Sequence, residues 1–286
     1  MYRVRSPNSR SYTEHRRCCS TVRAFGRRRR VAQRGGSKSG PRFQVLDLID
    51  VSVRFGGLKA LDGISFTVNE GEILGMIGPN GSGKSTAFNV ITGSLKSQSG
   101  RVIFQGEDIT GLAPHRVAHK GIARTFQLVR PFPELTALDN VYTGRLFGGA
   151  GARRTKATKR EALTVLERVG LADKAHVKAA DFTILERKWL EVARALAGGP
   201  KLILLDEFMA GISSRQVPAA VELVKSINSS GVTVVLVEHI VKAITGACDR
   251  VIVLEAGHKL VEGTVDEIVN DPKVIQAYLG SRHAGG

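Results

Sequence analysis

Residues 73–86 read Ile-Leu-Gly-Met-Ile-Gly-Pro-Asn-Gly-Ser-Gly-Lys-Ser-Thr, and the rest of the chain is organised around them. The apolar run Ile73–Ile77 predicts a short buried strand. The residues that follow it, Gly78–Ser85, fit the pattern G-x-x-x-x-G-K-[S/T] of a phosphate-binding loop. Apolar residues at helical spacing come next, and Gly93 stands where that helix would end. Strand, glycine-rich loop and helix are the context that this motif requires, so the sequence predicts a nucleoside triphosphate site.

The residue types in this loop suit phosphate. Gly81 and Gly83 allow the backbone to curl so that several N–H groups point at one anion, and the following helix adds the positive end of its dipole. Lys84 supplies a positive charge to the β- and γ-phosphates, and the Ser85 hydroxyl can ligate Mg²⁺. The loop residues expected to bind the nucleotide are Gly78, Pro79, Asn80, Gly81, Ser82, Gly83, Lys84, Ser85 and Thr86.

The positive charge of the chain is concentrated at its start. Residues 1–42 contain twelve arginines and one lysine against one glutamate, which makes +12 of the formal net charge of +16. The basic balance is therefore no reason to expect specific nucleic-acid binding by the folded part. Because residues 1–42 lack apolar periodicity, we predict a disordered tail. An organelle transit peptide, a basic arm for nucleic acid or anionic lipid, and an inert or start-site artefact all fit this segment.

Cysteine content and hydropathy bear on the redox environment of the chain and on its relation to a membrane. The three cysteines, Cys18, Cys19 and Cys248, form neither a disulfide framework nor a metal-binding spacing, which favours reduced thiols. No stretch approaches the roughly 20 apolar residues that a membrane-spanning helix needs. If the protein works at a membrane, we expect it to do so from the surface.

The pattern after the tail predicts an α/β fold. Alternating apolar residues before the phosphate loop predict an antiparallel β portion. Residues 128–195 combine structure-breaking prolines and glycines with helical spacing, which indicates a mostly helical insertion. Apolar runs at 202–205, 232–237 and 251–254, separated by helical patterns, predict a parallel sheet built from βαβ units. The predicted fold class is a P-loop NTPase with a RecA-like parallel-sheet core, an antiparallel β subdomain and an inserted α-helical subdomain.

Polar residues follow several of the predicted strands. Gln127, Asp206 with Glu207, and His239 each come after an apolar run. Since ligands of parallel sheets bind at the carboxyl ends of the strands, these side chains are expected to meet the phosphate loop at one edge. A P-loop enzyme needs a second carboxylate near Mg²⁺, which Asp206 can supply, and Glu207 can orient or deprotonate the attacking water. His239 alone is a weaker signal, because a histidine after a strand is often structural.

Together these features resemble the nucleotide-binding subunit of an ATP-binding cassette (ABC) transporter. The resemblance covers about residues 43–280, which we expect to form one ABC ATPase domain followed by a tail at 281–286. It is closest to the ATP-binding subunits of branched-chain amino acid importers. The segments that indicate this subfamily are Arg54-Phe-Gly-Gly, Gly121-Ile-Ala-Arg-Thr-Phe-Gln127 and the ending Ala277-Tyr-Leu-Gly280.

The resemblance implies ATP and Mg²⁺ as cofactors and assigns roles by position. By this analogy Phe55 stacks on adenine, while Ser85, Gln127 and Asp206 hold Mg²⁺. Glu207 is the general base, with Gln127 and His239 as further catalytic residues that sense Mg²⁺ or water and contact the γ-phosphate.

The resemblance also implies partners and a location. Two such subunits close on two ATP molecules and move membrane permease subunits, with a substrate-binding protein contributing indirectly. The expected place is the cytoplasmic face of the cell membrane, as a peripheral subunit, with no specific nucleic acid as partner.

One segment departs from the family pattern. The family signature Leu-Ser-Gly-Gly-Gln, which caps ATP held by the other subunit, corresponds here to Phe182-Thr-Ile-Leu-Glu186. Thr183 keeps a hydroxyl, but branched residues replace both glycines, and Glu186 replaces glutamine with an acid that repels phosphate if it points that way. A complete phosphate loop beside an altered signature leads us to expect a heterodimer with a second ABC ATPase.

Other functions fit parts of the sequence. Urea or amide import and lipid export stay open, because substrate contacts lie on other chains. A soluble ABC ATPase of translation or DNA repair usually has duplicated cassettes or long coiled coils, and this chain has one cassette without sustained heptads. A weakly catalytic regulatory subunit of an ABC heterodimer is the third alternative, and the chemistry of Glu207 distinguishes it.

Overall fold

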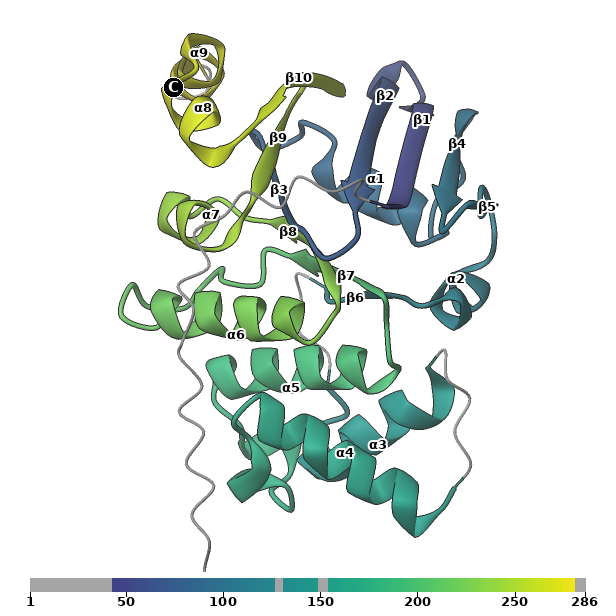
Figure 1. Cartoon of the computed structure of the whole chain (residues 1–286), viewed down its shortest axis with the longest axis vertical. Coiled ribbons are helices and arrows are strands. Elements are labelled where there is room, and N and C mark those ends of the chain that lie inside the picture. Colours follow the sequence, from purple (N-terminus) through teal and green to yellow (C-terminus); the bar gives the residue numbers. More distant parts are fainter. Residues whose placement is uncertain (1–42, 127–130, 149–153, 281–286) are drawn as a thin grey trace, which may run out of the picture. The chain divides into compact units, whose positions relative to one another are not determined.

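The computed structural model of the chain describes residues 43–126, 131–148 and 154–280 (Figure 1). The predicted tails at 1–42 and 281–286 lie outside the described residues, and so does Gln127. In the described part of the chain, no helix is long and apolar enough to cross a membrane.

A four-stranded antiparallel sheet has the order β2-β1-β4-β5. Its strands are β1 (Gln44–Phe55), β2 (Leu58–Asn69), β4 (Ser99–Phe104) and β5 (Glu107–Asp108). Buried and exposed residues alternate over much of the first two strands, because one face of such a sheet packs on the core and the other faces solvent. Phe55 is the last residue of β1, at the tip of the β1–β2 hairpin.

The second sheet carries the phosphate loop. Its order is β10-β9-β3-β8-β7-β6, parallel from β9 to β6, with β10 antiparallel at the edge. The strands are β3 (Ile73–Ile77), β6 (Ile122–Arg124), β7 (Leu202–Asp206), β8 (Thr233–Val237), β9 (Arg250–Glu255) and β10 (His258–Gly263). β7 and β8 are buried at every residue, as expected for parallel strands covered on both faces. The parallel directions bring the carboxyl ends of β3, β6, β7 and β8 to one edge.

Helices surround this sheet, and two short 3-10 turns lie between α4 and α5. Their bounds are α1 (Lys84–Ile91), α2 (Pro114–Lys120), α3 (Ala137–Phe147), α4 (Lys156–Arg168), α5 (Ile184–Ala197), α6 (Val217–Ser229), α7 (Val241–Ala247), α8 (Val265–Asn270) and α9 (Pro272–Gly280). α3, α4 and α5 pack on one another, and they lie on the side of the parallel sheet away from the antiparallel sheet (Figure 1). α5 also contacts β6, which connects these helices to the parallel sheet.

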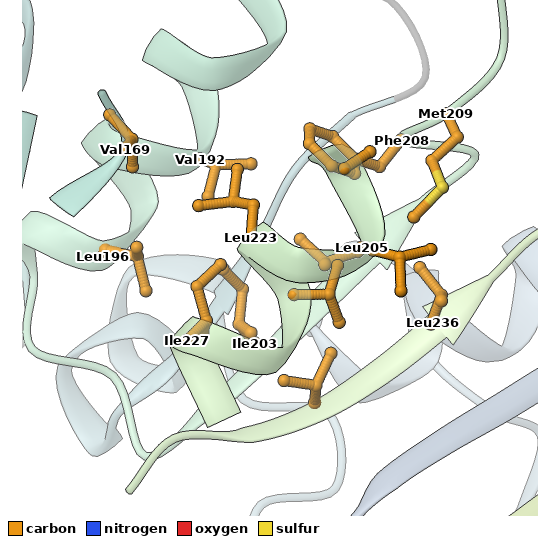
Figure 2. Packing of buried hydrophobic residues seen from close by; sticks show 14 of the residues in the cluster. Val169, Val192, Leu196, Ile203, Leu205, Phe208, Met209, Leu223, Ile227 and Leu236 are labelled. Atoms are coloured by element: carbon orange, nitrogen blue, oxygen red, sulfur yellow. The ribbon is translucent and has the colours of Figure 1, made fainter. Parts of the chain in front are cut away.

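The buried apolar residues form two clusters. One joins the antiparallel sheet and α1 to one face of the parallel sheet, and the other joins α3–α7 to the opposite face. Figure 2 shows part of the second cluster, with its labelled residues Val169, Val192, Leu196, Ile203, Leu205, Phe208, Met209, Leu223, Ile227 and Leu236. The ring of Trp189 lies 5.3 Å from the ring of Phe208, between centroids. The residue after Glu207 is thereby anchored on α5.

The α/β fold class predicted from the sequence is confirmed. The parallel strands and the antiparallel β portion lie within a few residues of the predicted segments, and helices separate β7, β8 and β9 as predicted. α8 and α9 follow the last predicted strand and were not predicted from the sequence. α8 begins with a capping box, in which the side chains of Thr264 and Glu267 bond to each other's backbone N–H. That pattern was readable in the sequence.

Candidate nucleotide-binding site

The phosphate loop connects β3 to α1, and two of its glycines are required by their backbone. Gly83 has φ 108°, and a Cβ there would lie 2.7 Å from the carbonyl oxygen of Ala60. Gly78 has φ 152°, and a Cβ there would lie 2.1 Å from the carbonyl oxygen of Leu254. Any side chain at either position would push the loop away from the neighbouring strands. The glycines therefore set the path of the loop as well as its access to phosphate.

Lys84 is buried at the start of α1. Its ammonium donates to the carbonyl oxygens of Gly78 at 2.7 Å and of Pro79 at 2.8 Å, so the charge lies inside the curl of the loop. Burial lowers the pKa of Lys84, while the charges of Glu207 and Asp206 act in the opposite direction. A cation held in this way attracts an anion at the loop, where a phosphate can replace the carbonyl partners.

A cavity of about 1050 Å³, called here the nucleotide cavity, opens over the loop. Its lining includes Phe55, every loop residue from Pro79 to Thr86, and Glu207. Residues of β10 and α9 complete it, among them Lys273. Phe55 is 52% exposed and lines the cavity, so it is accessible to a ligand there. The cavity therefore joins an aromatic surface, a phosphate loop and a carboxylate.

Asp206 ends β7 in a buried ion pair. Its Oδ2 atom lies 2.7 Å from Nη2 of Arg124, and the two side chains are 4% and 8% exposed. A serine hydroxyl at position 85 and a carboxylate at position 206 are hard oxygen ligands, the type that Mg²⁺ takes together with substrate phosphates and water. The donor set of this chain therefore fits Mg²⁺, with Ser85 and Asp206 as the described residues that would hold it.

Glu207 follows Asp206 in a left-handed backbone conformation that ends the regular strand. Its φ is +46°, in the left-handed region, and its N–H donates to the carbonyl oxygen of Val237 at 2.9 Å. Glu207 is one of the residues that line the nucleotide cavity. The Oε1 atom lies 3.0 Å from Nε2 of His239, which follows the neighbouring strand β8. Strained backbone of this kind is concentrated at functional sites.

Glu238, a buried acid that was not predicted as a site residue, immediately precedes His239 in the chain. Glu238 accepts a hydrogen bond from the backbone N–H of Met209 at 2.6 Å. Burial raises the pKa of Glu238 to about 7, with the nearby Lys188 acting in the opposite direction. Lys188 of α5 donates to the carbonyl oxygen of Phe208 at 3.0 Å. The segment after Glu207 is thus held from both sides, by α5 and by the end of β8.

The altered signature segment lies at the start of α5, and its two polar side chains, Thr183 and Glu186, bond to each other. Thr183 is the N-cap, and its side chain and that of Glu186 form a capping box. Glu186 accepts from the backbone N–H of Thr183 at 2.9 Å and from its hydroxyl at 3.0 Å. It also forms an ion pair with Lys174 at 2.5 Å. The hydrogen bond from Lys174 is the main reason that the pKa of Glu186 is lowered, and the hydrogen bonds from Thr183 lower it further. Glu186 is therefore kept in its charged form.

The chain matches a known family over more than half of its length. The ABC transporter family is found at residues 61–210, and a branched-chain amino acid ATP-binding cassette transporter family at residues 258–284. This chain is a member of the ABC transporter ATPase family. The match begins in β2 and includes the phosphate loop, the acids that end β7 and the altered signature.

Relatives of this ABC ATPase are named for one transport task. The high-affinity branched-chain amino acid transport ATP-binding protein BraF of Pseudomonas aeruginosa is 36% identical over 249 residues, which is 82% of this chain and 98% of the relative. LivG of Salmonella typhimurium, with the same description, is 37% identical over 243 residues, or 80% of this chain and 94% of the relative. The match therefore spans nearly the whole length of each relative.

Solved cassettes have the same fold as this ABC ATPase. An ATP-binding cassette of an ABC transporter in its ADP conformation aligns with a TM-score of 0.77 and 34% identity, over 83% of this chain and 99% of that one. A dimeric cassette in a post-hydrolysis state, bound to ADP and Pi, aligns with a TM-score of 0.69 and 28% identity, over 77% and 98%.

The structure brings most of the predicted site residues of the cassette together. Phe55 and Glu207 line the nucleotide cavity with the loop, and His239 touches Glu207. Asp206 lies one residue away, but it is held by Arg124, which the sequence analysis did not single out. Thr183 and Glu186 are not part of the lining of this cavity, and their role at a partner's nucleotide stays a prediction. The prediction for Gln127 lies outside the described residues.

Replacing Phe55 by alanine is expected to weaken ATP binding by about 5- to 150-fold, because stacking of an aromatic ring on a base contributes ~1–3 kcal/mol. Titration of a fluorescent ATP analogue against the purified cassette measures this. The matched control is Phe43→Ala, since Phe43 is 76% exposed and lies outside the cavity lining. Equal affinities for the two variants would remove Phe55 from the nucleotide site.

Proposed function

We propose that this ABC ATPase is the ATP-hydrolysing subunit of an importer for branched-chain amino acids. The observation that carries the proposal is the match of residues 258–284 to a branched-chain amino acid ATP-binding cassette transporter family. This segment covers β10, α8 and α9, so the similarity extends beyond the general ATPase core. The names of the relatives agree with it.

The proposed mechanism assigns ATP hydrolysis to the loop and the strand ends. The backbone N–H groups of the loop and Lys84 bind the β- and γ-phosphates, with Ser85 and Thr86 at the start of α1. Ser85 and Asp206 would hold Mg²⁺, which would supply positive charge against the negative charge that develops on the phosphates. Glu207 takes the proton of the attacking water, and His239 orients the Glu207 carboxylate through the 3.0 Å contact.

A second cavity supports a membrane permease as partner. It measures about 560 Å³ and is lined from both α3 and the parallel-sheet core. We call it the aromatic groove, because Phe126, Phe132 and Phe147 line it and are 54%, 47% and 70% exposed. Clustered exposed aromatic side chains are typical of protein interfaces. In the proposed complex a permease segment fills this groove, which places the ATPase at the cytoplasmic face of the membrane.

Deleting the gene for this ATPase is expected to abolish energised uptake of radiolabelled leucine, isoleucine and valine by the host cells. Uptake should return with the wild-type gene and not with a Glu207→Gln gene, because the latter lacks the proposed base. Urea, acetamide and lipid export are measured in the same strains. Loss of one of these fluxes with normal amino acid uptake would reject the proposed substrate in favour of that alternative.

The signature segment supports a heterodimer with a second ABC ATPase. The carboxylate of Glu186 occupies the N-terminus of α5, and Ile184, 68% exposed, covers the position that a glycine has in the family pattern. A helix N-terminus stabilises anions, so an internal carboxylate there opposes a partner's γ-phosphate. The loop of this chain would then be completed by a better signature from a different subunit, while its own signature completes the second site poorly.

A further inference from the structure

Arg124 joins three parts of the molecule with one guanidinium. It ends β6, and its Nη2 atom bonds to Oδ2 of Asp206 at 2.7 Å. Its Nη1 atom donates to Oδ1 of Asn89 at 2.6 Å, on α1 one turn after the phosphate loop residues. One side chain therefore connects the carboxylate proposed for Mg²⁺ to the helix that carries Lys84, Ser85 and the start of the phosphate site.

Aromatic rings hold the guanidinium in place. Its central carbon lies 5.5 Å from the ring centroid of Phe88 and 5.2 Å from that of Phe126. Both distances lie in the range of a cation–π contact. Because a planar guanidinium bonds through a fixed fork, Lys at this position would keep the charge and lose the simultaneous bonds to Asp206 and Asn89.

The environment of this ion pair is costly to maintain. Arg124 is 8% and Asp206 is 4% exposed at the side chain, and the Nε atom of Arg124 is buried without a hydrogen-bond partner. A buried ion pair loses hydration energy that a pair of apolar residues would not. We therefore attribute to this ion pair an effect on the orientation of Asp206 and not on the stability of the fold. By fixing one oxygen of the Asp206 carboxylate, Arg124 also sets the direction of the other oxygen.

Arg124 also belongs to the aromatic groove. It lines that groove together with Phe126 and Phe132, and the backbone N–H of Phe126 donates to the buried Glu191 of α5 at 3.1 Å. Thr125, between the two, accepts a hydrogen bond from the N–H of Asp206 at 3.3 Å. The segment 124–126 thus contacts Asp206 at two points: the Arg124 guanidinium bonds to its carboxylate, and the Thr125 hydroxyl bonds to its backbone N–H.

We propose that Arg124 is a positioning residue that orients Asp206 for Mg²⁺ and ties this carboxylate to α1 and the aromatic groove. The inference deepens the proposed function and rests on the assignment of Asp206 to Mg²⁺. Removing a residue that hydrogen-bonds to a metal ligand typically lowers metal affinity or activity by about 10- to 100-fold. The guanidinium fulfils this role here because it bonds to the ligand and to a rigid helix at once.

The test is Mg²⁺ titration of nucleotide binding, in the full chain, followed with a fluorescent ATP analogue without turnover. Arg124→Lys is expected to raise the Mg²⁺ concentration at half-saturation by about tenfold, and to leave binding of the analogue in EDTA unchanged. The matched control is Arg145→Lys, since Arg145 of α3 is ion-paired with Glu161 and lines neither cavity. An unchanged or tighter Mg²⁺ response in Arg124→Lys would overturn the proposal.

A second background separates positioning from a general effect on folding. In Asp206→Asn, Arg124→Lys is expected to cause no further change in the Mg²⁺ response, because the arginine acts through that carboxylate. Additive losses would overturn the proposal, and thermal unfolding of each variant reports its fold separately. Neither readout involves import, so failure of the transport assignment and failure of this inference give different results.

Discussion

Replacing Glu207 by glutamine is expected to lower the ATPase rate by about 10²- to 10⁴-fold, the range for loss of a general base. The amide keeps the shape of the side chain and cannot take a proton from water. ATP binding should be retained, since the loop, Lys84 and Phe55 are untouched. The measurement is phosphate release at saturating ATP, beside equilibrium binding of the same variant.

Two further variants make this result specific. Glu255→Gln changes a carboxylate that also lines the nucleotide cavity but belongs to β9, and its activity should stay near that of the wild type. His239→Ala removes the 3.0 Å contact to Oε1 and should lower the rate at unchanged ATP affinity. If Glu207→Gln hydrolyses ATP as fast as the wild type in the assembled complex, this chain is a regulatory subunit and the partner performs the chemistry.

The parts of the fold that follow a local pattern could be predicted from the sequence. The loop at 78–86 requires a strand before it and a helix after it. Short runs of wholly apolar residues are typical of parallel strands that are buried on both faces. Their shared direction also predicted that Asp206, Glu207 and the phosphate loop would meet. These conclusions depend on spacing and strand direction, which are properties of a linear pattern.

Contacts between distant residues could not be predicted in the same way. Arg124 and Asp206 are 82 positions apart, and no periodicity pairs them. The raised pKa of Glu238 depends on burial, which comes from the packing of α5 and β8 around it. By contrast, the capping box in the altered signature could have been predicted from the sequence, because Thr183 and Glu186 have the required spacing. The acid was interpreted only as a possible repulsion of phosphate, whereas the structure directs it to its own helix.

Restoring the signature of this chain is expected to raise the ATPase rate of the purified cassette by about 10- to 100-fold, because a lost transition-state donor typically costs 10²–10³ in rate. The variant carries Ile184→Gly, Leu185→Gly and Glu186→Gln. Glycines allow a partner's phosphate to approach the N-terminus of α5, and glutamine removes the charge that opposes it. The measurement is ATP turnover against protein concentration, since the gain requires two copies to meet.

The second capping box of the chain offers a matched control. Glu267→Gln removes the same charge from the start of α8, and the glutamine can keep the capping box with Thr264. Glu267→Gln should leave turnover at the wild-type level. The signature variant should increase turnover, although its two glycines have low helix propensity and weaken the start of α5. Fast turnover by wild-type homodimer, or no gain on restoration, would contradict the heterodimer. In that case Glu186 would be a cap and no more, and two identical chains would suffice for two working sites.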